Sequence, residues 1–590
     1  MDIFSVISLF GGLALFLYGM HVLSNSLEKL AGSKIEGILR KLTSNPLKGL
    51  ALGTVITAVI QSSSAVTVML VGLVNSGIMG LSQAISITMG SNIGTTVTAW
   101  LLSLTGIESN SFWLRLMKPE SFSPIVAFIG ILLIMVAKKQ AKKDIGSMFV
   151  GFAVLMYGMD FMSGAVEPLA GMPQFASILT AFSNPVLGVL AGAIFTAIIQ
   201  SSSASVGVLQ ALSMTGSITY SSAIPIIMGQ NIGTCITAII SSIGASRNAR
   251  RVAVVHLLFN IIGTVILLAL WTVIGVFVEF TFENSPVTPF SIAVIHSIFN
   301  VISTVILFPF SKLLEKCACI IIKDKEELTS DDKENSAFLD DRLLTVPSIA
   351  VGNALSTSRT MGALAENSVL DSLKLLERYD EEKAKEIVEL EGVLDNYEDR
   401  LGTYLVKLSK CQLSDSDAKN VSLLLHVITD LERIGDHAEN LVDVSREMYE
   451  KKISFSHEAR NELRTLAEAV TQILSNTTRA FQTGDLALAK TIEPLEQVID
   501  TLINEIRTRH ISRLQKGSCT IELGFVLTDL LTNCERISDH CSNIAVAMIE
   551  AAHGTFDTHE YLHSVKTEPD SDFTAQCAQW KSKFEIKYDI

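Results

Sequence analysis

The stretch Gln61-Ser62-Ser63-Ser64-Ala65 interrupts an apolar segment of the chain, and the same five residues recur as Gln200-Ser201-Ser202-Ser203-Ala204. The same offset of 139 positions aligns four further landmarks, which are Tyr18-Gly19-Met20 with Tyr157-Gly158-Met159, Ala31-Gly32 with Ala170-Gly171, Asn45-Pro46 with Asn184-Pro185, and Asn92-Ile93-Gly94-Thr95 with Asn231-Ile232-Gly233-Thr234. One constant offset through five landmarks indicates that this part of the chain is an internal duplication.

The composition divides the 590-residue chain into two parts of different character. Charged residues make up 18% of the whole, whereas an average soluble protein carries about a quarter. Residues 1–322 hold 16 Lys and Arg against 11 Asp and Glu, a net charge of +5, and residues 323–590 hold 30 against 49, a net charge of −19. We therefore expect the first part to lie in lipid and the second in water. The acidic excess argues against a nucleic-acid partner.

The two copies contain the same order of apolar segments. Each copy begins with a long apolar segment, continues with the segment that holds Gln-Ser-Ser-Ser, and then has two spanning helices; the ranges are 3–27, 47–75, 78–104 and 121–137 in the first copy, and 145–166, 186–214, 218–244 and 252–279 in the second, with a final helix over 290–310. The apolar run on either side of the polar break is only about 21 Å long as a helix, against a hydrocarbon core of roughly 30 Å. This pattern predicts a re-entrant hairpin of two half-helices whose tip is buried in protein.

The basic residues predict how the segments cross the membrane. They cluster at four places on one side of the predicted bilayer, namely Arg40/Lys41/Lys48, Lys138/Lys139/Lys142/Lys143, Arg247/Arg250/Arg251 and Lys312/Lys316. The opposite loops, 105–120, 167–185 and 280–289, carry only Arg115 and Lys118. The positive-inside rule then places the N-terminus outside and the acidic C-terminal part in the cytoplasm of an inner-membrane, multi-pass protein. Three crossings per copy make the copies inverted, which is typical of transporters.

The hairpin tips have the chemistry of an anion site. The second half-helix of each presents unpaired backbone N–H groups and the positive end of its dipole, and serine hydroxyls add further donors. The predicted binding residues are Gln61, Ser62, Ser63, Ser64, Gln200, Ser201, Ser202 and Ser203. Two inverted tips entering from opposite faces can share one oxyanion.

A coupling cation is expected because no Lys or Arg lies within 50–104 or 186–244 to balance the anion. Asn92, Thr95, Asn231 and Thr234 occur in Gly-flanked stretches that we expect to be unwound, and their oxygens suit Na⁺. Proton coupling is less favoured, since Asp160 is the only carboxylate well inside a predicted span.

Three other interpretations compete with this one. Ser, Thr and Gly in membrane helices also serve helix packing, although four consecutive polar residues repeated at a fixed offset favour function. His256 and His296 each begin a His-x-x-Phe-Asn string that ends at Asn260 or Asn300, and interhelical hydrogen bonding explains them at least as well as substrate contact. An intramembrane serine protease would place one exposed nucleophile in a Gly-rich turn. Two symmetric triplets suit binding better, so an enzyme is not expected.

The doubled Gln-Ser-Ser-Ser, with Asn-Ile-Gly-Thr downstream of each copy, resembles the type II sodium–phosphate cotransporter family over roughly residues 1–315. The resemblance implies Na⁺-coupled transport of inorganic phosphate, with the phosphate held between the two Gln-Ser-Ser-Ser segments. Cys235, where the first copy has Thr96, departs from the repeat, so one contact is expected to differ between the copies. A carrier for another oxyanion, such as sulfate or arsenate, and a non-transporting membrane phosphate sensor remain alternatives.

The second part of the chain is also duplicated. After a charge-dense linker over 323–350, a helical pattern runs through 351–553, and Glu432-Arg-Ile-Gly-Asp436-His437 recurs as Glu535-Arg-Ile-Ser-Asp539-His540. Carboxylates four residues apart on a helix repel unless a cation lies between them, so Glu432, Asp436, Glu535 and Asp539 are candidate ligands for Fe, Mn or Mg; a solvated acidic face is the alternative. The string resembles the E-x-x-x-D motif of PhoU-like domains, which implies phosphate regulation.

Together these observations predict an all-α protein: a polytopic membrane part with two inverted repeats and re-entrant hairpins, and a soluble PhoU-like helical bundle. The expected domains are repeat 1 at 1–140, repeat 2 with the final helix at 141–322, the linker, the bundle, and a polar tail at 554–590. Besides phosphate, sodium and lipid, a second copy of the chain or a cytoplasmic regulatory protein is a candidate partner.

Overall fold

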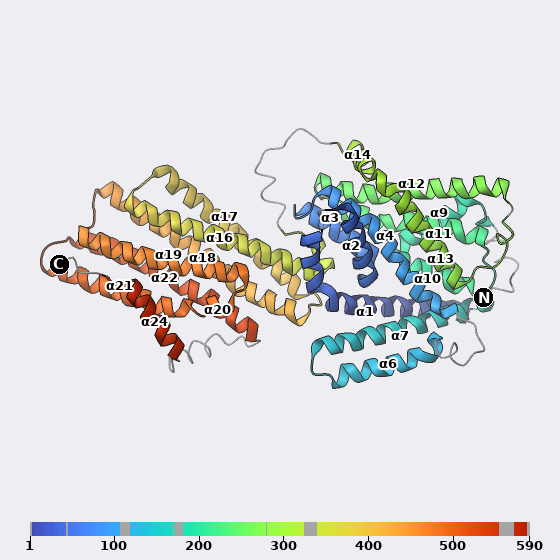
Figure 1. Ribbon diagram of the computed structural model, residues 1–590, viewed down its shortest axis with the longest axis horizontal. Helices are drawn as coiled ribbons and strands as arrows, with labels where there is room; N and C mark the ends of the chain where they lie inside the picture. Colours follow the sequence, from blue (N-terminus) through green and yellow to red (C-terminus); the bar gives the residue numbers. More distant parts are fainter. Residues whose placement is uncertain are drawn as a thin grey trace. The chain divides into compact units, whose positions relative to one another are not determined.

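The computed structural model describes residues 3–42, 45–106, 118–168, 172, 181–278, 280–323, 339–553 and 571–586. Within these ranges the chain forms helices and no β-strand (Figure 1). It divides into two compact units, Met1–Ala350 and Val351–Ile590, each with its own core. The predicted all-α class is confirmed.

The first unit contains two copies of one helix pattern. The first copy consists of α1 (Ile3–Leu42), α2 (Pro46–Ile60), α3 (Ser63–Asn75), α4 (Leu81–Ser103), the short η1 (Leu104–Gly106) and α6 (Pro119–Val136). The second consists of α7 (Gln140–Val166), α9 (Pro185–Ile199), α10 (Ser202–Ser213), α11 (Tyr220–Ser241) and α12 (Arg247–Phe277). The unit then continues with α13 (Pro289–Leu307), η3 (Phe308–Phe310), α14 (Ser311–Ile321) and η4 (Asp341–Thr345).

Both predicted hairpins are present as two short helices that break at the polar motif. The α2–α3 hairpin breaks between Ile60 and Ser63, and the α9–α10 hairpin between Ile199 and Ser202. Their four helices are 15, 13, 15 and 12 residues long, too short for any one of them to cross a hydrocarbon core of about 30 Å. Among the described residues, five helices are long and apolar enough to span a membrane, over Ile3–Leu30, Gln140–Val166, Tyr220–Ser241, Arg247–Phe277 and Pro289–Ile321.

The first helices of the two copies, α1 and α7, lie side by side and run antiparallel (Figure 1). Gly12 contacts Gly158, and Gly19 contacts Gly151. A Cβ atom on Gly19 would lie 2.2 Å from the backbone nitrogen of Leu155, so this approach requires glycine. Positions 12 and 151 are equivalent in the duplication, as are 19 and 158, so exchanging the copies reproduces the same contacts. The copies are therefore inverted relative to each other.

Buried side chains connect this helix pair to the second hairpin. Phe16 and Leu155, which are equivalent in the duplication, are both fully buried. The Phe16 ring also reaches α10, where a Cβ atom on Gly207 would lie 2.6 Å from its Cζ. The α10 helix is thus packed on one side by the α1–α7 pair, and its orientation is set by the core of the unit.

The second unit is a bundle of long helices that is duplicated as well. The first copy consists of α16 (Pro347–Glu377), α17 (Glu381–Ser409) and α18 (Asp415–Lys451), and the second of α19 (His457–Thr483), α21 (Ile492–Gln515) and α22 (Ile521–His553), with the short α20 (Leu486–Ala489) between α19 and α21. Figure 1 shows these helices lying lengthwise against one another. The two copies meet through α18 and α22.

Two segments contain more structure than the sequence pattern predicts. The expected linker over 323–350 includes η4 and the start of α16, because Leu343, Val346 and Ile349 are buried. The expected polar tail over 554–590 includes α24 (Ser571–Lys583), which packs on α21. There the Sγ of Cys577 lies 3.7 Å from the carbonyl oxygen of Pro494. Residues 324–338, 554–570 and 587–590 lie outside the described part of the chain.

Candidate functional site

The first hairpin turns at Gln61, which has a left-handed backbone conformation with φ 61° and ψ 18°. Its N–H ends α2 by donating to the carbonyl of Thr57 at 2.8 Å. Ser62 then begins α3 as its N-cap, and its hydroxyl oxygen accepts a hydrogen bond from the N–H of Ala65 at 3.2 Å. A non-glycine residue in this conformation costs on the order of 1 kcal/mol or more, and such strain concentrates at functional sites.

The second hairpin has the same geometry. Gln200 ends α9 with φ 59° and ψ 21°, and Ser201 caps α10 by accepting from the N–H of Ala204 at 3.2 Å. Among the described residues other than glycine, one more has a positive φ, Lys452 at the end of α18. The strained turn thus occurs at both tips and nowhere else in the described part of the membrane unit.

The serines that follow each turn stand at the start of a helix. Ser63 and Ser202 are the first helical residues of α3 and α10, and each is 5% exposed. Backbone N–H groups in the first turn have no acceptor within the helix, and the helix dipole adds a partial positive charge there. Together with the hydroxyls of Ser64 and Ser203, these donors form a cup that can hold an oxyanion without a Lys or Arg.

Both hairpins pack against the same two helices. The α4 helix contacts α3 of the first hairpin and α10 of the second, and α11 contacts α10 and α3 in the same way. The predicted cation ligands lie on these helices, Asn92 and Thr95 on α4 and Asn231 and Thr234 on α11. The fold therefore brings all four residues onto the helices that flank the two tips.

The four predicted cation ligands are buried polar residues. Asn231, for example, is 4% exposed and donates its Nδ2 to the carbonyl of Ile227 at 2.9 Å, and Asn92 donates in the same way to the carbonyl of Thr88 at 3.2 Å. Thr95 and Thr234 also bond one turn back within their own helices. Because the amide nitrogens of both asparagines donate hydrogen bonds within their helices, the amide oxygens are the atoms that can coordinate a cation.

The expectation that these stretches are unwound is wrong. The α4 and α11 helices run without a break through Asn92 and Asn231. The flanking glycines serve close packing instead: a Cβ atom would lie 2.0 Å from the carbonyl oxygen of Leu50 if built on Gly90, and 2.0 Å from that of Val189 if built on Gly229. A glycine before the asparagine therefore signals helix contact rather than an opened helix.

The surroundings of the two tips differ. Gln61 is buried, and its Oε1 accepts a hydrogen bond from the hydroxyl of Thr98 on α4 at 2.9 Å. Gln200 is exposed at the surface of the unit. The hydroxyl of Thr237, which occupies the position of Thr98 in the second copy, is buried and has no hydrogen-bond partner among the residues that the structure describes. The glutamine of the first tip is thus hydrogen-bonded to α4, and that of the second tip has no such bond to Thr237 of α11.

The two His-x-x-Phe-Asn strings lie inside the helix packing. His256 and His296 are 2% and 1% exposed on α12 and α13. Asn260 donates its Nδ2 to the Sγ of Cys235 at 3.3 Å, so the residue that breaks the repeat contacts the first of these strings. Sequence reasoning missed this contact, although both residues were singled out. It supports interhelical hydrogen bonding for Asn260, whereas the Nδ1 of His256 and both ring nitrogens of His296 are buried without a hydrogen-bond partner among the described residues.

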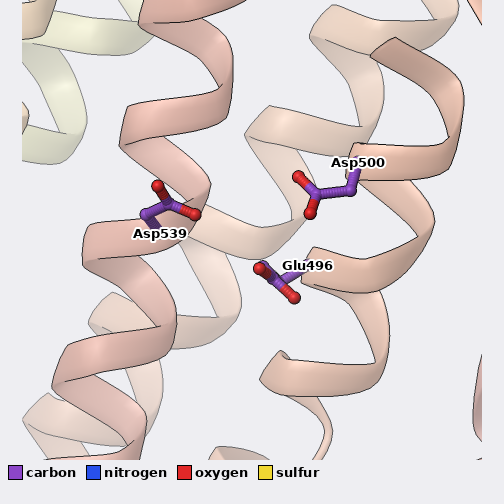
Figure 2. Close-up of side chains that lie close together, drawn as sticks. All are labelled: Glu496, Asp500 and Asp539. Atoms are coloured by element: carbon purple, nitrogen blue, oxygen red, sulfur yellow. The ribbon is translucent and has the colours of Figure 1, made fainter. Parts of the chain in front are cut away.

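In the second unit, three carboxylates converge between α21 and α22. Oxygens of Glu496, Asp500 and Asp539 all lie within 4.8 Å of one another, and Figure 2 shows Asp539 on a different helix from the other two. Glu496 is 5% exposed. Glu535, one turn before Asp539 on α22, does not belong to this set, and its carboxylate lies 3.8 Å from the guanidinium of Arg507. Such a set of oxygens fits a hard divalent cation or iron.

In the first copy neighbouring carboxylates influence one another, although among the described residues only the second copy brings three of them within 4.8 Å. Burial, followed by the charges of Asp436 and Glu398, raises the pKa of Glu432 to about 7. Burial, followed by the charges of Glu439 and Asp436, also raises the pKa of Glu391. These carboxylates disfavour one another's negative charge, and a metal cation bound among them would relieve that repulsion.

Glu391, Asp395, Glu496 and Asp500 were not among the predicted ligands. The string Glu-x-x-x-Asp occurs on two helices of each copy, as Glu391/Asp395 and Glu432/Asp436 in the first and as Glu496/Asp500 and Glu535/Asp539 in the second, and once more on α18 as Glu439/Asp443. The pairs on α17 and α21 lack the flanking Arg-Ile and His that made the other two recognisable. The spacing of four residues alone does not single them out, because Glu439/Asp443 has it as well.

Comparison with known sequences explains both duplications. The sequence model of the Na+/Pi-cotransporter family matches residues 15–164 and again 154–282, and that of the PhoU domain matches residues 358–444 and 463–548. The chain belongs to the Na+/Pi-cotransporter family. Each family model matches twice, once for each copy of its unit. This membership confirms the resemblance seen in the sequence, and a transporter family is not an enzyme class.

Several named relatives cover different parts of this family member. The "Putative inorganic phosphate export protein YjbB" of Salmonella typhimurium is 23% identical over 561 residues, which are 94% of this chain and 100% of that protein. The uncharacterized protein YqeW of Bacillus subtilis is 31% identical over 45% of this chain and 82% of its own length. The sodium-dependent phosphate transport protein 2A of Rattus norvegicus is 44% identical over 97 residues, 16% of this chain and 15% of that protein.

A crystal structure of PhoU from Pseudomonas aeruginosa aligns with 36% of this chain and 100% of that protein, at 23% identity and a TM-score of 0.33.

Proposed function

We propose that this chain is a sodium-coupled carrier of inorganic phosphate, and that phosphate is held between the two Gln-Ser-Ser-Ser tips. The observation that carries the proposal is the strained turn found twice, at Gln61 and Gln200, each followed by a serine-capped helix start. Phosphate presents four oxygens, so two cups of N–H and hydroxyl donors can share it. The names of the relatives, phosphate export and sodium-dependent phosphate transport, support the choice of phosphate.

Sodium coupling follows from the charge of the site. No Lys or Arg occurs within 50–104 or 186–244, so the anion's charge is not balanced by the protein. Asn92, Thr95, Asn231 and Thr234 supply neutral oxygens on helices beside both tips, a ligand type suited to Na⁺. The cation would then enter with the anion and offset the electrostatic cost of burying the anion in a low-dielectric site.

The orientation in the membrane is part of the same proposal. The basic loops lie on one side of the predicted bilayer, which places the N-terminus outside and the PhoU unit in the cytoplasm of a bacterial-type inner membrane. In that position the PhoU unit would regulate transport, with Fe, Mn or Mg held by its converging carboxylates. A homodimer or a cytoplasmic regulatory protein would act through this unit.

The test is phosphate flux in proteoliposomes. We expect ³²P-phosphate to accumulate when an inward Na⁺ gradient is imposed, and not when K⁺ replaces Na⁺. Flux should be measured for both directions of the gradient, because the site chemistry is indifferent to direction. Absence of gradient-driven flux from folded protein that still binds phosphate would support the membrane sensor instead. Competition by unlabelled sulfate or arsenate at concentrations similar to phosphate would support a general oxyanion carrier.

A further inference from the structure

The short helix η4 joins the chain leading to the PhoU unit to the first hairpin of the membrane unit. Its Leu343 is fully buried and lies against Gly72 of α3, where a Cβ atom would be 2.8 Å from the Cδ2 of Leu343. Ser63, the first serine of the α3 helix, is nine residues earlier on the same helix. Because a short helix moves as a rigid rod, a side chain seated at Gly72 fixes the position of the tip as well.

Arg342 extends this contact to the other repeat. Its guanidinium donates to the carbonyl of Ser241, the last residue of α11, and at 2.9 Å to that of Ile243 just beyond. Carbonyl groups at a helix C-terminus lack partners within the helix and carry a partial negative charge, so a partly buried arginine is favourable there. A salt bridge of 2.9 Å to Asp340 orients the guanidinium.

Asn75, the last residue of α3, makes two further hydrogen bonds at this contact. Its Nδ2 donates to the same Asp340 carboxylate at 2.7 Å, and its Oδ1 accepts from the N–H of Ser246 at 2.7 Å. Ser246 is the N-cap of α12. Asp340 therefore bonds to residues on both sides, Asn75 of repeat 1 and Arg342, which in turn holds repeat 2. At 7% exposure, the carboxylate is shielded from water, which strengthens both bonds.

The second hairpin has no counterpart of this contact among the described residues. The positions equivalent to Gly72 and Asn75 are Ala211 and Met214, which offer neither the space for a leucine nor an amide. The contact is thus an addition to the duplicated fold, made at one end of one hairpin. Its chain continues directly into α16, which begins at Pro347, two residues after η4 ends. The same α16 crosses the boundary into the PhoU unit at Val351.

We propose that Asp340, Arg342 and Leu343 are positioning residues that clamp the C-terminal ends of α3 and α11 together, and that the PhoU unit acts on transport by pulling on this clamp. The idea rests on the proposed transport function. The clamp ties the hairpin helix that begins at one serine triplet to the helix that carries Asn231 of the other repeat. In a carrier of inverted repeats, transport requires the repeats to move against each other. A tie between them therefore sets the rate of that motion.

The experiment compares Arg342→Ala and Arg342→Lys in the full-length chain, reconstituted with an imposed Na⁺ gradient. Loss of the guanidinium should lower the maximal rate of ³²P-phosphate uptake at least fivefold and change the phosphate KM less than twofold, because both tips are intact. Lysine should restore part of the rate, since it can still donate to a carbonyl. Arg251→Ala is the matched control: Arg251 on α12 also donates to a helix-end carbonyl, that of Ile322, but its bond to Ile322 does not link α3 to α11.

A second readout separates this proposal from the proposed function. Hydrogen exchange of the full-length protein in detergent should show faster exchange of the α3 backbone in Arg342→Ala than in wild type, and no such change in Arg251→Ala. If wild type carries no phosphate but exchange responds as stated, the transport proposal fails and the clamp stands. If exchange in α3 is unchanged, or if the maximal rate per folded molecule does not fall in a transporting protein, the clamp is overturned.

Discussion

The two hairpins have the same backbone and different surroundings. Gln61 and Gln200 share a left-handed turn to within a few degrees, yet Gln61 is buried and bonded to Thr98, whereas Gln200 is exposed and its expected partner, Thr237, is not bonded to it. The backbone contacts do not differ in this way, because a Cβ atom on Gly53 or on its equivalent Gly192 would lie 2.0 or 2.1 Å from a carbonyl oxygen of α4 or α11; the difference is therefore in the glutamine side chains. One structure thus shows the same hairpin turn twice, once with its glutamine hydrogen-bonded to the neighbouring helix and once without that bond.

This difference suggests what changes during transport. In an inverted duplication, equivalent elements exchange their conditions when the carrier changes the side from which its site is open. We infer that the opposite state has Gln200 bonded to Thr237 and Gln61 released from Thr98. The clamp on α3 fits this picture, because it holds the hairpin whose glutamine is bonded to Thr98 and has no counterpart on the other hairpin among the described residues.

The largest effect is expected from the serines that both hairpins share. Ser63→Ala and Ser202→Ala should each raise the phosphate KM roughly tenfold to a hundredfold, because a hydrogen bond to a charged group contributes about 1.5–3 kcal/mol. Initial rates of ³²P-phosphate uptake measure this. Ser76→Ala and Ser213→Ala are matched controls, since those hydroxyls bond within the far ends of the same hairpins. Normal uptake by both tip variants would make the tips packing elements.

A smaller effect is expected at the asparagines beside the tips. Asn92→Ala and Asn231→Ala should raise the Na⁺ concentration for half-maximal uptake about fivefold or more, corresponding to roughly 1 kcal/mol for one lost ligand oxygen. The phosphate KM should change less than twofold at saturating Na⁺. Unequal effects of the two changes would locate the cation nearer one hairpin, and an unchanged Na⁺ curve would assign both residues to helix packing.

Sequence reasoning predicted the elements of this fold better than their contacts. The hairpins and their break points follow from run length and polarity, which are local properties. Whether α4 and α11 are unwound or continuous does not follow from local properties. A glycine such as Gly90 or Gly229 is compatible both with an unwound helix and with the close approach of a neighbouring backbone. Likewise Glu496 and Asp500 become a candidate site only when folding brings α21 against Asp539.

The threonines that distinguish the hairpins should respond in opposite directions. Thr98→Val leaves the Gln61 oxygen buried without its donor and should cost about 1–2 kcal/mol of stability. Thr237→Val removes a buried hydroxyl that has no partner among the described residues, and should raise stability by up to about 1 kcal/mol. Thermal melting in detergent gives both signs. If Thr237 bonds Gln200 in the opposite state, Thr237→Val should nevertheless slow uptake; a faster carrier would contradict the inferred exchange.

The smallest effect concerns the second duplicated pair, the two acidic sites of the PhoU unit. Without metal, the pKa of Glu432 is about 7 in the folded protein and near 4.5 when unfolded, so the folded state binds the proton more tightly. Stability from this group is then complete below about pH 4.5 and is lost as pH rises to 7. Glu432→Gln should therefore raise the stability of the metal-free protein at pH 8, by about 1 kcal/mol because the group is partly exposed to solvent, and have no effect at pH 4.5.

With metal bound, Glu432→Gln should lower stability at pH 8 instead of raising it. The same measurement can then be made at both acidic sites of the PhoU unit. A cation that binds only the folded protein stabilises it, so with Mn²⁺ at pH 8 the loss of a ligand in Glu432→Gln should lower hydrogen-exchange protection of α17 and α18. Glu535→Gln should lower protection of α21 and α22 less, because Glu535 lies by Arg507 and three other carboxylates already converge there. Protection that ignores both Mn²⁺ and chelator in wild type would leave two solvated acidic faces, and the PhoU unit would then act on the clamp without metal.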